Sequence, residues 1–440
     1  MKILTVGGGG REHAVVEALH RSGAEIYSIM KNANPGIISR AKVYKIVNER
    51  HIDDICEFAI EHDIGIAFIG PEAPLEIGLV DALENIGVKC AAPTKAAARI
   101  ETSKAFMREL LTKYNIRGNL DYVVFHTEED AEGYLKGLDH EIVIKPVGLT
   151  GGKGVKVQGE HLNSHEETMK YIREILSVDA GKEGVILEEK AIGEEFTQMV
   201  FVDGKTILPM PLVQDHKRAY DGDVGPNTGG MGSYSDANHL LPFVTEEDRK
   251  EALIILKNIV QAMNEEGCPY HGPMYGQFML TAKGPKIIEI NARFGDPEAM
   301  NVLSIMETNF LSVIKDMVNG KLKDEVKFKS LATVCKYVVP KGYGTESEAG
   351  TEICVEGEKI RDEEHMEIYF ANVDVVDGKM ITGTSRSIGV VGIGATLEEA
   401  NINCENALKY VHGDAICVRH DIGTRELIQK KIEHMLKIRS

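Results

Sequence analysis

The sequence predicts an α/β protein that begins with a parallel, doubly wound sheet. Within the first 100 residues, short apolar stretches alternate with segments of helical periodicity. Such strands between helices are typical of a sheet with helices on both faces. The later strands alternate polar and apolar residues and pair as hairpins, which adds antiparallel structure to the middle of the chain. The first sheet is expected to contain residues 3–6, 26–30, 44–47, 64–69 and 88–91, with a helix over residues 12–22.

The composition is that of a folded protein with several domains. The 440 residues are 43% hydrophobic and 27% charged, enough for two to four domains with cores of their own. No apolar run reaches the length of a membrane span, and the chain enters a strand directly after Met1. Seven scattered cysteines without a Cys-x-x-Cys pair predict reduced thiols in a cytoplasmic protein. The net charge of −18 argues against a nucleic-acid partner, so local basic residues must hold any anionic substrate.

A glycine-rich turn follows the first expected strand. Residues 7–13 read Gly-Gly-Gly-Gly-Arg-Glu-His, which lacks the third glycine of a dinucleotide fingerprint. Glycines at a helix N-terminus, such as Gly9 and Gly10, still suit a single phosphate. The turns at residues 34–36 and 70–75 also follow expected strands and therefore lie at the carboxyl edge of the sheet, where ligands collect. Taken singly, each turn is explained better by simple turn chemistry.

Residues 141–157 predict a strand, a glycine-rich loop and a second strand, after a helix over residues 104–114. The loop is not a Walker A loop, because Val147 replaces its first glycine and Gly154 follows Lys153 where Ser or Thr is required. A glycine hairpin around Lys153 can fold over phosphates as a lid, with Lys145 beneath it on the first strand. A plain hairpin is the alternative, although three glycines around one lysine exceed what a turn needs.

The stretch over residues 185–196 reads as a strand, a connector and a second strand. An extended connector can present backbone groups to an adenine, and Glu195 after it can bind ribose hydroxyls. Residues 196–202 and 206–209 are expected to pair as a hairpin through Asp203-Gly204. Residues 214–218 and 225–232 lie in a long segment poor in regular structure, and a long loop in a compact domain is usually functional or disordered.

The central candidate site is the hairpin expected between residues 274–280 and 286–291. Strand alternation puts Glu289, Asn291 and Arg293 on one face. A carboxylate and an amide oxygen side by side suit a hard cation such as Mg²⁺, and the arginine can hold an anion bidentately. The pairing also lets Gln277 face the same site. An ordinary amphipathic strand with a solvated polar face would be the better explanation if this stretch stood alone.

The remaining chain predicts further helices and a smaller α/β unit. Thr245 caps a helix that runs to residue 266. A long helix is expected over residues 297–319, and a charged hinge over residues 320–329. The smaller unit spans residues 331–430, with strands near 333–339 and 366–370, a hairpin at 376–379, and a helix capped by Thr396.

Several motifs together resemble one known enzyme family. Residues 293–300 read Arg-Phe-Gly-Asp-Pro-Glu-Ala-Met, which is similar to the signature of the phosphoribosylamine–glycine ligase family, also called glycinamide ribonucleotide synthetase, of the ATP-grasp superfamily. Residues 8–14, 70–75, 214–218 and 226–232 also look like motifs of that family, in its order. The resemblance covers nearly the whole chain. It implies a Rossmann-like N-terminal domain (residues 1–102), an ATP-grasp domain with a glycine-rich lid (103–320) and a small α/β C-terminal domain (328–430).

The resemblance also implies an activity and a set of site residues. The reaction would join glycine to 5-phosphoribosylamine at the expense of ATP, with Mg²⁺ or Mn²⁺, in a monomer or small homo-oligomer. The expected catalytic residues are Arg293, Asp215 and Lys145, and the expected metal ligands are Glu289, Asn291 and Gln277. The expected ATP-binding residues are Lys104, Lys145, Gly151, Gly152, Lys153, Gly154, Glu188 and Glu195. The expected substrate-binding residues are Gly9, Gly10, Asn34, Gly36, Glu72, Asp215, Lys217, Arg218, Gly229, Gly230 and Arg293.

The chain departs from the family pattern at three places. Pro146-Val147 stands before the lid where the family usually has Ala-Asp, and residues 370–373 read Phe-Ala-Asn-Val where His-Ala-Gly-Thr is typical. Gln277 occupies a position that is commonly small or apolar. Two other functions stay open: an ATP-grasp ligase with a different acid or amine, and a nucleotide-binding relative without catalysis.

Overall fold

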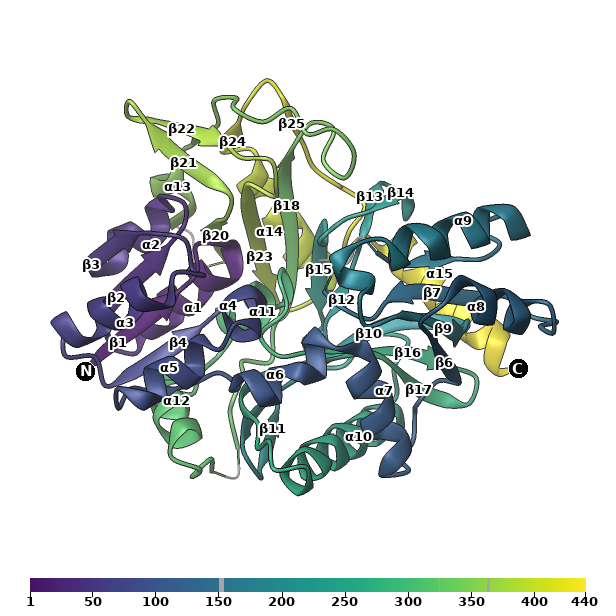
Figure 1. Cartoon of the computed structure of the whole chain (residues 1–440). Helices are drawn as coiled ribbons and strands as arrows, with labels where there is room; N and C mark the ends of the chain where they lie inside the picture. The colour runs from purple at the N-terminus through teal and green to yellow at the C-terminus, as the bar shows by residue number, and fades with distance from the viewer. Residues whose placement is uncertain (150–153, 324, 362–364) are drawn as a thin grey trace.

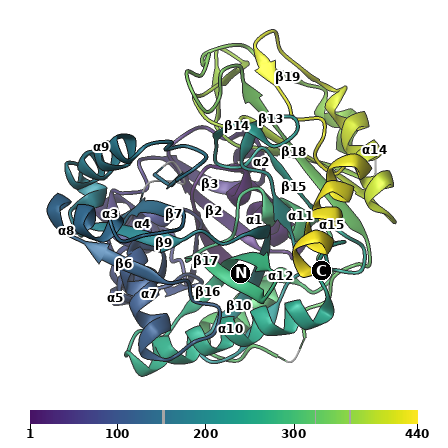
Figure 2. The same cartoon turned by 90° about the vertical axis from the view of Figure 1, so that its right-hand side faces the viewer.

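Three layers of structure surround the centre of the molecule (Figure 1). The structure is a computed structural model, and it describes residues 1–149, 154–323, 325–361 and 365–440. The N-terminal sheet and its helices lie on one side, two antiparallel sheets lie on the other, and a sheet built largely from the last hundred residues stands above them. The view turned by 90° shows strands β16 and β17 in the middle of this arrangement (Figure 2).

The N-terminal layer is the predicted doubly wound sheet. Its five strands are parallel and lie in the order β3-β2-β1-β4-β5. Strands β2 and β3 lie on one side of β1, and β4 and β5 lie on the other. This change of side places the loops after β1 and β4 next to each other at the carboxyl edge. The strands are β1 (Lys2–Val6), β2 (Glu25–Met30), β3 (Ala41–Ile46), β4 (Ile66–Ile69) and β5 (Lys89–Cys90). The helices are α1 (Gly10–Arg21), α2 (Pro35–Arg40), α3 (Ile52–Glu61), α4 (Glu72–Glu76), α5 (Leu79–Asn85) and α6 (Lys95–Thr102).

Two antiparallel four-stranded sheets form the central part. One has the order β6-β9-β7-β8 and the other β11-β10-β16-β17. The predicted pairing of Gln277 with Glu289 occurs between β16 and β17. The strands are β6 (Tyr122–Phe125), β7 (Ile142–Pro146), β8 (Lys156–Val157), β9 (Val185–Glu189), β10 (Gly193–Asp203), β11 (Ile207–Pro209), β16 (His271–Thr281) and β17 (Gly284–Asn291). The helices are α7 (Lys104–Lys113), α8 (Glu128–Leu135), α9 (His165–Leu176), the 3-10 turn η1 (Asp179–Gly181) and α10 (Glu246–Glu265).

The third sheet combines central and C-terminal segments in the order β12-β15-β18-β23-β20, with β25 paired to β18. The strands are β12 (Gln214–Asp215), β15 (Gly232–Ser235), β18 (Ala332–Pro340), β20 (Met366–Phe370), β23 (Ile388–Gly394) and β25 (Ile416–Cys417). Short pairs are β13 (Arg218–Tyr220) with β14 (Val224–Asn227), β19 (Cys354–Val355) with β24 (Val411–His412), and β21 (Val373–Val376) with β22 (Lys379–Thr382). The helices of this part are α11 (Glu298–Ser304), α12 (Phe310–Val318), α13 (Gly357–Arg361), α14 (Leu397–Leu408) and α15 (Arg425–Arg439). The predicted domain boundary between residues 320 and 328 stays a prediction. The third sheet contains strands from both sides of this boundary.

Local signals in the sequence set several element ends. Thr245 and Asp248 form a capping box at the start of α10, where the side chains satisfy backbone donors that the first turn leaves open. The β21–β22 hairpin turns through Asp377 and Gly378, with φ of 51° and 78°, as the Asp-Gly pair predicts.

Two expectations of local structure are wrong. The long helix expected over residues 297–319 is two helices, α11 and α12, because the chain leaves helical geometry after Ser304 and Met306 forms a β-bridge with Phe328. The segment around residues 214–235 contains four short strands, because β12 pairs with β15 and β13 pairs with β14 inside it, and the distant strand β18 pairs with β15. Neither the Met306 bridge nor the pairing of β15 with β18 is readable from local periodicity.

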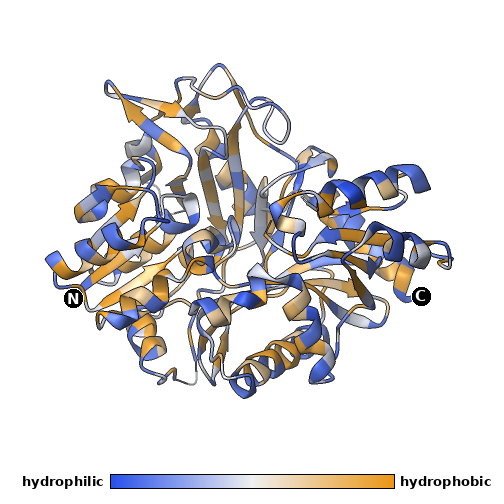
Figure 3. Ribbon diagram, viewed as in Figure 1, coloured by the Kyte–Doolittle hydropathy of each residue, from blue (hydrophilic) through white to orange (hydrophobic). Residues whose placement is uncertain are grey.

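Many strands of the sheets carry apolar residues (Figure 3), and clusters of buried apolar residues join the layers. Strand β18 is buried along its whole length, as expected for the central strand of a covered sheet. No helix within the described ranges is long and apolar enough to cross a membrane.

Candidate active site

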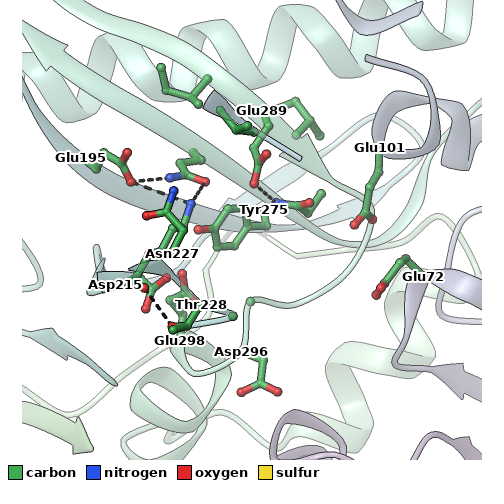
Figure 4. A pocket seen from close by; sticks show the side chains of 18 of the residues that line it. Glu72, Glu101, Glu195, Asp215, Asn227, Thr228, Tyr275, Glu289, Asp296 and Glu298 are labelled. Carbon is green, nitrogen blue, oxygen red and sulfur yellow. Dashed lines mark hydrogen bonds and ion pairs between the residues drawn. The ribbon is translucent and has the colours of Figure 1, made fainter. Parts of the chain in front are cut away.

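A cavity of about 800 Å³ lies where the three layers meet. Its walls come from the carboxyl edge of the N-terminal sheet, from both central sheets and from the loops before β23. Figure 4 shows that many of its side chains end in oxygen. Of the predicted site residues, it is lined by Gly9, Glu72, Lys104, Lys145, Glu188, Glu195, Asp215, Lys217, Arg218, Gly229, Gln277, Glu289, Asn291 and Arg293.

The polar face of β17 supplies the predicted metal ligands. Asn291 Nδ2 donates to Glu289 Oε1 at 3.1 Å, so the two side chains lie together as alternation requires. Burial works to raise the pKa of Glu289, but Lys217 and the Asn291 amide outweigh it and lower the pKa below its usual value. An ionised carboxylate beside an amide oxygen is a donor set that fits Mg²⁺ or Mn²⁺, with further positions left for water and phosphate oxygens. Within the described residues, no group of three or more His, Cys, Asp and Glu side chains is arranged as a metal site.

Gln277 faces the same cavity, and both ends of its amide have protein partners. Its Oε1 accepts from Lys217 Nζ at 2.7 Å, and its Nε2 donates to Glu195 Oε2 at 2.5 Å. Lys217 Nζ also lies 3.8 Å from Glu195 Oε2, and these contacts are drawn in Figure 4. Burial works to lower the pKa of Lys217, but Glu195 and Glu289 raise it, so the ammonium stays charged.

A second group of charges comes from helix α7 and strands β7 and β9. Lys145 Nζ is 2.6 Å from Glu188 Oε2, and Arg108 Nε donates to the other oxygen of the same carboxylate at 2.8 Å. All three side chains are buried. Burial works to raise the pKa of Glu188, but the two cations lower it to about 2. Lys104 Nζ donates to Gly148 O at 2.7 Å, and burial lowers its pKa to about 8. The cavity therefore holds a neighbouring pair of lysines, and their contact with ATP phosphates stays a prediction.

Asp215 and Glu298 form a buried pair of carboxyl groups on another wall of the cavity (Figure 4). Burial and the charge of Glu298 raise the pKa of Asp215 well above its usual range, and burial also raises the pKa of Glu298. Glu298 Oε1 accepts from Thr197 Oγ1 at 3.3 Å, whereas Asp215 Oδ1 is buried without a hydrogen-bond partner among the described residues. An unpartnered buried carboxyl oxygen that faces a cavity is suited to accept a hydrogen bond from a ligand.

Arg293 lies between two carboxylates from the N-terminal layer. Its Nη2 is 3.2 Å from Glu101 Oε1 and its Nε is 3.5 Å from Glu72 Oε2. Burial raises the pKa of Glu101 to about 7, and this carboxylate also accepts from the Ala292 backbone N–H at 2.6 Å. The guanidinium is thus fixed in the cavity wall, with 19% of its side chain exposed.

Other protein groups already occupy most of the contacts around the glycine turn after β1. Gly9 N–H donates to Glu12 Oε2 at 2.9 Å in a capping box, so that donor is already used. Gly10, Asn34 and Gly36 do not line the cavity as the structure describes it. Asn34 caps α2 and donates to Gly8 O and Phe370 O, at 2.9 and 2.7 Å. A side chain at Gly10 would meet the Tyr337 hydroxyl, and one at Gly36 would meet the His13 ring. The structure thus gives these three residues packing or capping contacts, and their substrate contacts stay predictions.

The remaining predicted residues belong to the glycine-rich stretch or to the segment around the β13–β14 hairpin. Gly151, Gly152 and Lys153 fall outside the described residues, and Gly154 is not part of the cavity wall. Arg218 donates to Gly225 O at 2.9 Å and lies 3.2 Å from Glu160 Oε2, so its charge serves a local contact. Gly230 has a φ of 108°, and a side chain there would meet Asp215 Oδ1.

Sequence reasoning missed Arg386, which lies before β23. Its Nη1 donates to Gly229 O and Asp296 O, and its Nη2 is 3.1 Å from Asp296 Oδ2. Its guanidinium also lies 4.6 Å from the centre of the Tyr337 ring. The C-terminal sheet thereby fixes the loop that carries Asp296 and closes one end of the cavity. No local signal marks Arg386, since the hydrogen-bond partners of its side chain are at least 90 residues away in sequence.

The fold and the cavity together define an ATP-grasp protein. Two antiparallel sheets enclose buried lysines, a carboxylate–amide pair on a strand, and a connector after β9, and a doubly wound sheet completes the cleft. Sequence models agree with this class along the chain. Phosphoribosylglycinamide synthetase N domain matches residues 1–101, its ATP-grasp (A) domain matches residues 102–299, and its C domain matches residues 333–425.

Individual relatives give the same result. The phosphoribosylamine–glycine ligase of Methanocorpusculum labreanum is 49% identical over all of both chains, and that of Pyrococcus horikoshii is 48% identical over 100% of this chain and 98% of its own. A solved phosphoribosylamine–glycine ligase from Thermotoga maritima is 28% identical, with a TM-score of 0.81 over 96% of this chain and 100% of that one. The biotin carboxylase domain of the Hydrogenobacter thermophilus 2-oxoglutarate carboxylase has a TM-score of 0.73 over 99% of this chain and 93% of that one, at 15% identity, and shares the fold. The chain belongs to the phosphoribosylglycinamide synthetase family.

Proposed function

We propose that this protein is an ATP-dependent ligase that joins glycine to 5-phosphoribosylamine in purine biosynthesis. The products would be glycinamide ribonucleotide, ADP and phosphate. The observation that carries the proposal is the single cavity in which a lysine pair, a carboxylate–amide strand and a buried carboxyl pair meet. The names of full-length relatives at 48–49% identity supply the identity of the two substrates.

ATP would occupy the part of the cavity between the two central sheets. Lys104 and Lys145 would contact its phosphates, the connector between β9 and β10 would face the adenine, and Glu195 would bind the ribose. Glu188 would keep the Lys145 ammonium in place, since it lies 2.6 Å away. Glu289 and Asn291 would hold a divalent cation, either Mg²⁺ or Mn²⁺. When bound, the cation would neutralise charge on the transferring phosphoryl group.

The reaction needs no nucleophile from the protein. A glycine carboxylate oxygen attacks the γ-phosphorus of ATP, the bond to the β,γ-bridging oxygen breaks, and ADP leaves. The amine of phosphoribosylamine then attacks the carbonyl carbon of the glycyl phosphate and expels inorganic phosphate as the amide forms. Arg293 and Lys217 would bind the anionic groups during these steps, and Asp215 would contact a substrate amine. Catalysis would rest on orientation, on fixed charges and on exclusion of water from the acyl phosphate.

A coupled ADP-release assay tests this proposal. Phosphoribosylamine is generated in situ, and glycine, ATP and Mg²⁺ are omitted one at a time. We expect ADP only when all are present, together with a product that contains both glycine and the ribosyl amine. Equal turnover with alanine or serine in place of glycine would refute the assignment of the acid. ATP consumption that ignores both co-substrates would refute the ligase function.

A further inference from the structure

The C-terminal helix α15 lies against the central sheets. It packs on β10 and β16 through a face that includes the buried residues Leu427, Ile428 and Met435. Figure 1 shows it in yellow, on the side of the molecule that carries the central sheets. The family match to the C domain ends at residue 425, where this helix begins. The predicted C-terminal domain, residues 328–430, also leaves out most of the helix.

Lys431 extends from α15 into the wall of the cavity. Its Nζ lies 3.1 Å from Glu194 Oε2 and 2.9 Å from Asp223 Oδ2, and 20% of its side chain is exposed. One turn further along the helix, His434 Nδ1 is 2.6 Å from the other oxygen of Glu194. Lys431 therefore forms ion pairs with two carboxylates that come from different segments of the cavity wall.

The two carboxylates lie next to the residues proposed to act on ligands. Glu194 directly precedes Glu195 at the start of β10. Asp223 accepts from His216 Nδ1 at 3.1 Å and from Arg419 Nη1 at 2.8 Å. His216 is 3% exposed, and its backbone separates Asp215 from Lys217. A displacement of Glu194 or Asp223 is thus passed on through one residue to both sides of the cavity.

We propose that Lys431 is a positioning residue. From helix α15, it holds the start of β10, on the nucleotide side of the cavity, in place relative to the β13–β14 hairpin. This inference rests on the proposed function, because it assumes that Glu195 and Lys217 meet ligands. Without the ammonium, Glu194 and Asp223 repel each other in a largely buried place, which displaces the start of β10 that carries Glu195. The binding of ATP should suffer more than the chemical step.

Lys431→Met tests this, with Lys430→Met as the matched control, since Lys430 is the exposed neighbour on the same helix. We expect Lys431→Met to raise the KM for ATP on the order of tenfold, as small misplacements of binding groups do, with the KM for glycine and the kcat changed less than about twofold. Lys431→Arg should restore most of the ATP affinity, because it returns the cation. Lys430→Met should match the wild type.

Three outcomes overturn the proposal. Equal kinetic constants for Lys431→Met and Lys430→Met would place Lys431 outside the binding of ATP. A lower melting temperature with an unchanged KM for ATP would show a role in stability alone. A failure of Lys431→Arg to restore affinity would exclude the charge as the cause.

If Lys431→Met does not fold, Glu194→Gln removes the same ion pair from the other side and must raise the KM for ATP, or the proposal fails. Absence of glycine-dependent ADP release in the wild type would instead refute the proposed function.

Discussion

The buried carboxylate of Glu188 offers a prediction whose size follows from the structure. Glu188→Gln keeps the shape of the side chain and removes the negative charge between Arg108 and Lys145, at 2.8 and 2.6 Å. Arg108 is 0% exposed and Lys145 is 4% exposed, so neither cation can turn to water. The variant leaves two buried like charges without their common partner.

Two estimates of the loss agree. The pKa of Glu188 falls from 4.5 to about 2 in the folded protein, which corresponds to about 3 kcal/mol. Removal of one partner from a buried ion pair costs about 3–5 kcal/mol in general. Because the folded-state pKa is the lower one, this stabilisation is complete above pH 4.5 and is lost as the pH falls toward 2. At pH 7, Glu188→Gln should therefore lower the melting temperature by roughly 3–5 °C, since a chain of 440 residues shifts by about 1 °C for each kcal/mol.

Thermal unfolding followed by circular dichroism measures this directly. Glu128→Gln is the control, because its ion pair with Arg173 is open to solvent and should not change the melting temperature noticeably. A fall of less than about 2 °C for Glu188→Gln, equal to the control, would refute the reasoning, since it would mean that the cations find other partners. The difference in melting temperature between Glu188→Gln and the wild type should also become smaller as the pH is lowered below 4.5.

Three further predictions concern activity. Glu289→Ala should lower turnover by at least about 10³-fold in the ADP-release assay. The circular dichroism spectrum should stay unchanged, because an unfolded variant would be inactive for a different reason. Arg293→Lys should lower turnover markedly, since lysine keeps the charge but cannot contact Glu72 and Glu101 as a fork; wild-type turnover in this variant would place Arg293 outside the reaction. For the wild type, kcat/KM for ATP should fall above pH 8, because Lys104 with a pKa of about 8 loses its charge there. Lys104→Arg should remove this fall, and an unchanged profile would assign it to another group.

Local patterns in the sequence predicted the elements that are made by neighbouring residues. The five parallel strands, the β16–β17 hairpin and the capping box of Thr245 all depend on periodicity or on groups three residues apart, and the structure has each of them. The break between α11 and α12 was not predictable in this way. It depends on a bridge from Met306 to Phe328, and no periodicity carries that information.

The same distinction holds for the candidate site. Alternation along one strand brought Glu289 and Asn291 to one face, and they are hydrogen-bonded there. Arg386 and Lys431 reach the cavity from sheets and helices that are distant in sequence, and Glu101 meets Arg293 only through tertiary packing. The pKa of Glu101 depends on this burial, so the sequence contains no direct sign of it.

The sheet that joins β15 to β18 has a consequence for how the chain is made. Ser233 and Tyr234 pair with Cys335 and Val334, about a hundred residues later. Asn301, fully buried, donates to Ser233 O and Thr333 Oγ1 and ties α11 to both strands. During synthesis, the segment that carries Asp215 and Lys217 cannot complete its hydrogen bonds until the ribosome has released residues beyond 340. The cavity wall that carries Asp215 and Lys217 should therefore be among the last parts of the chain to become ordered.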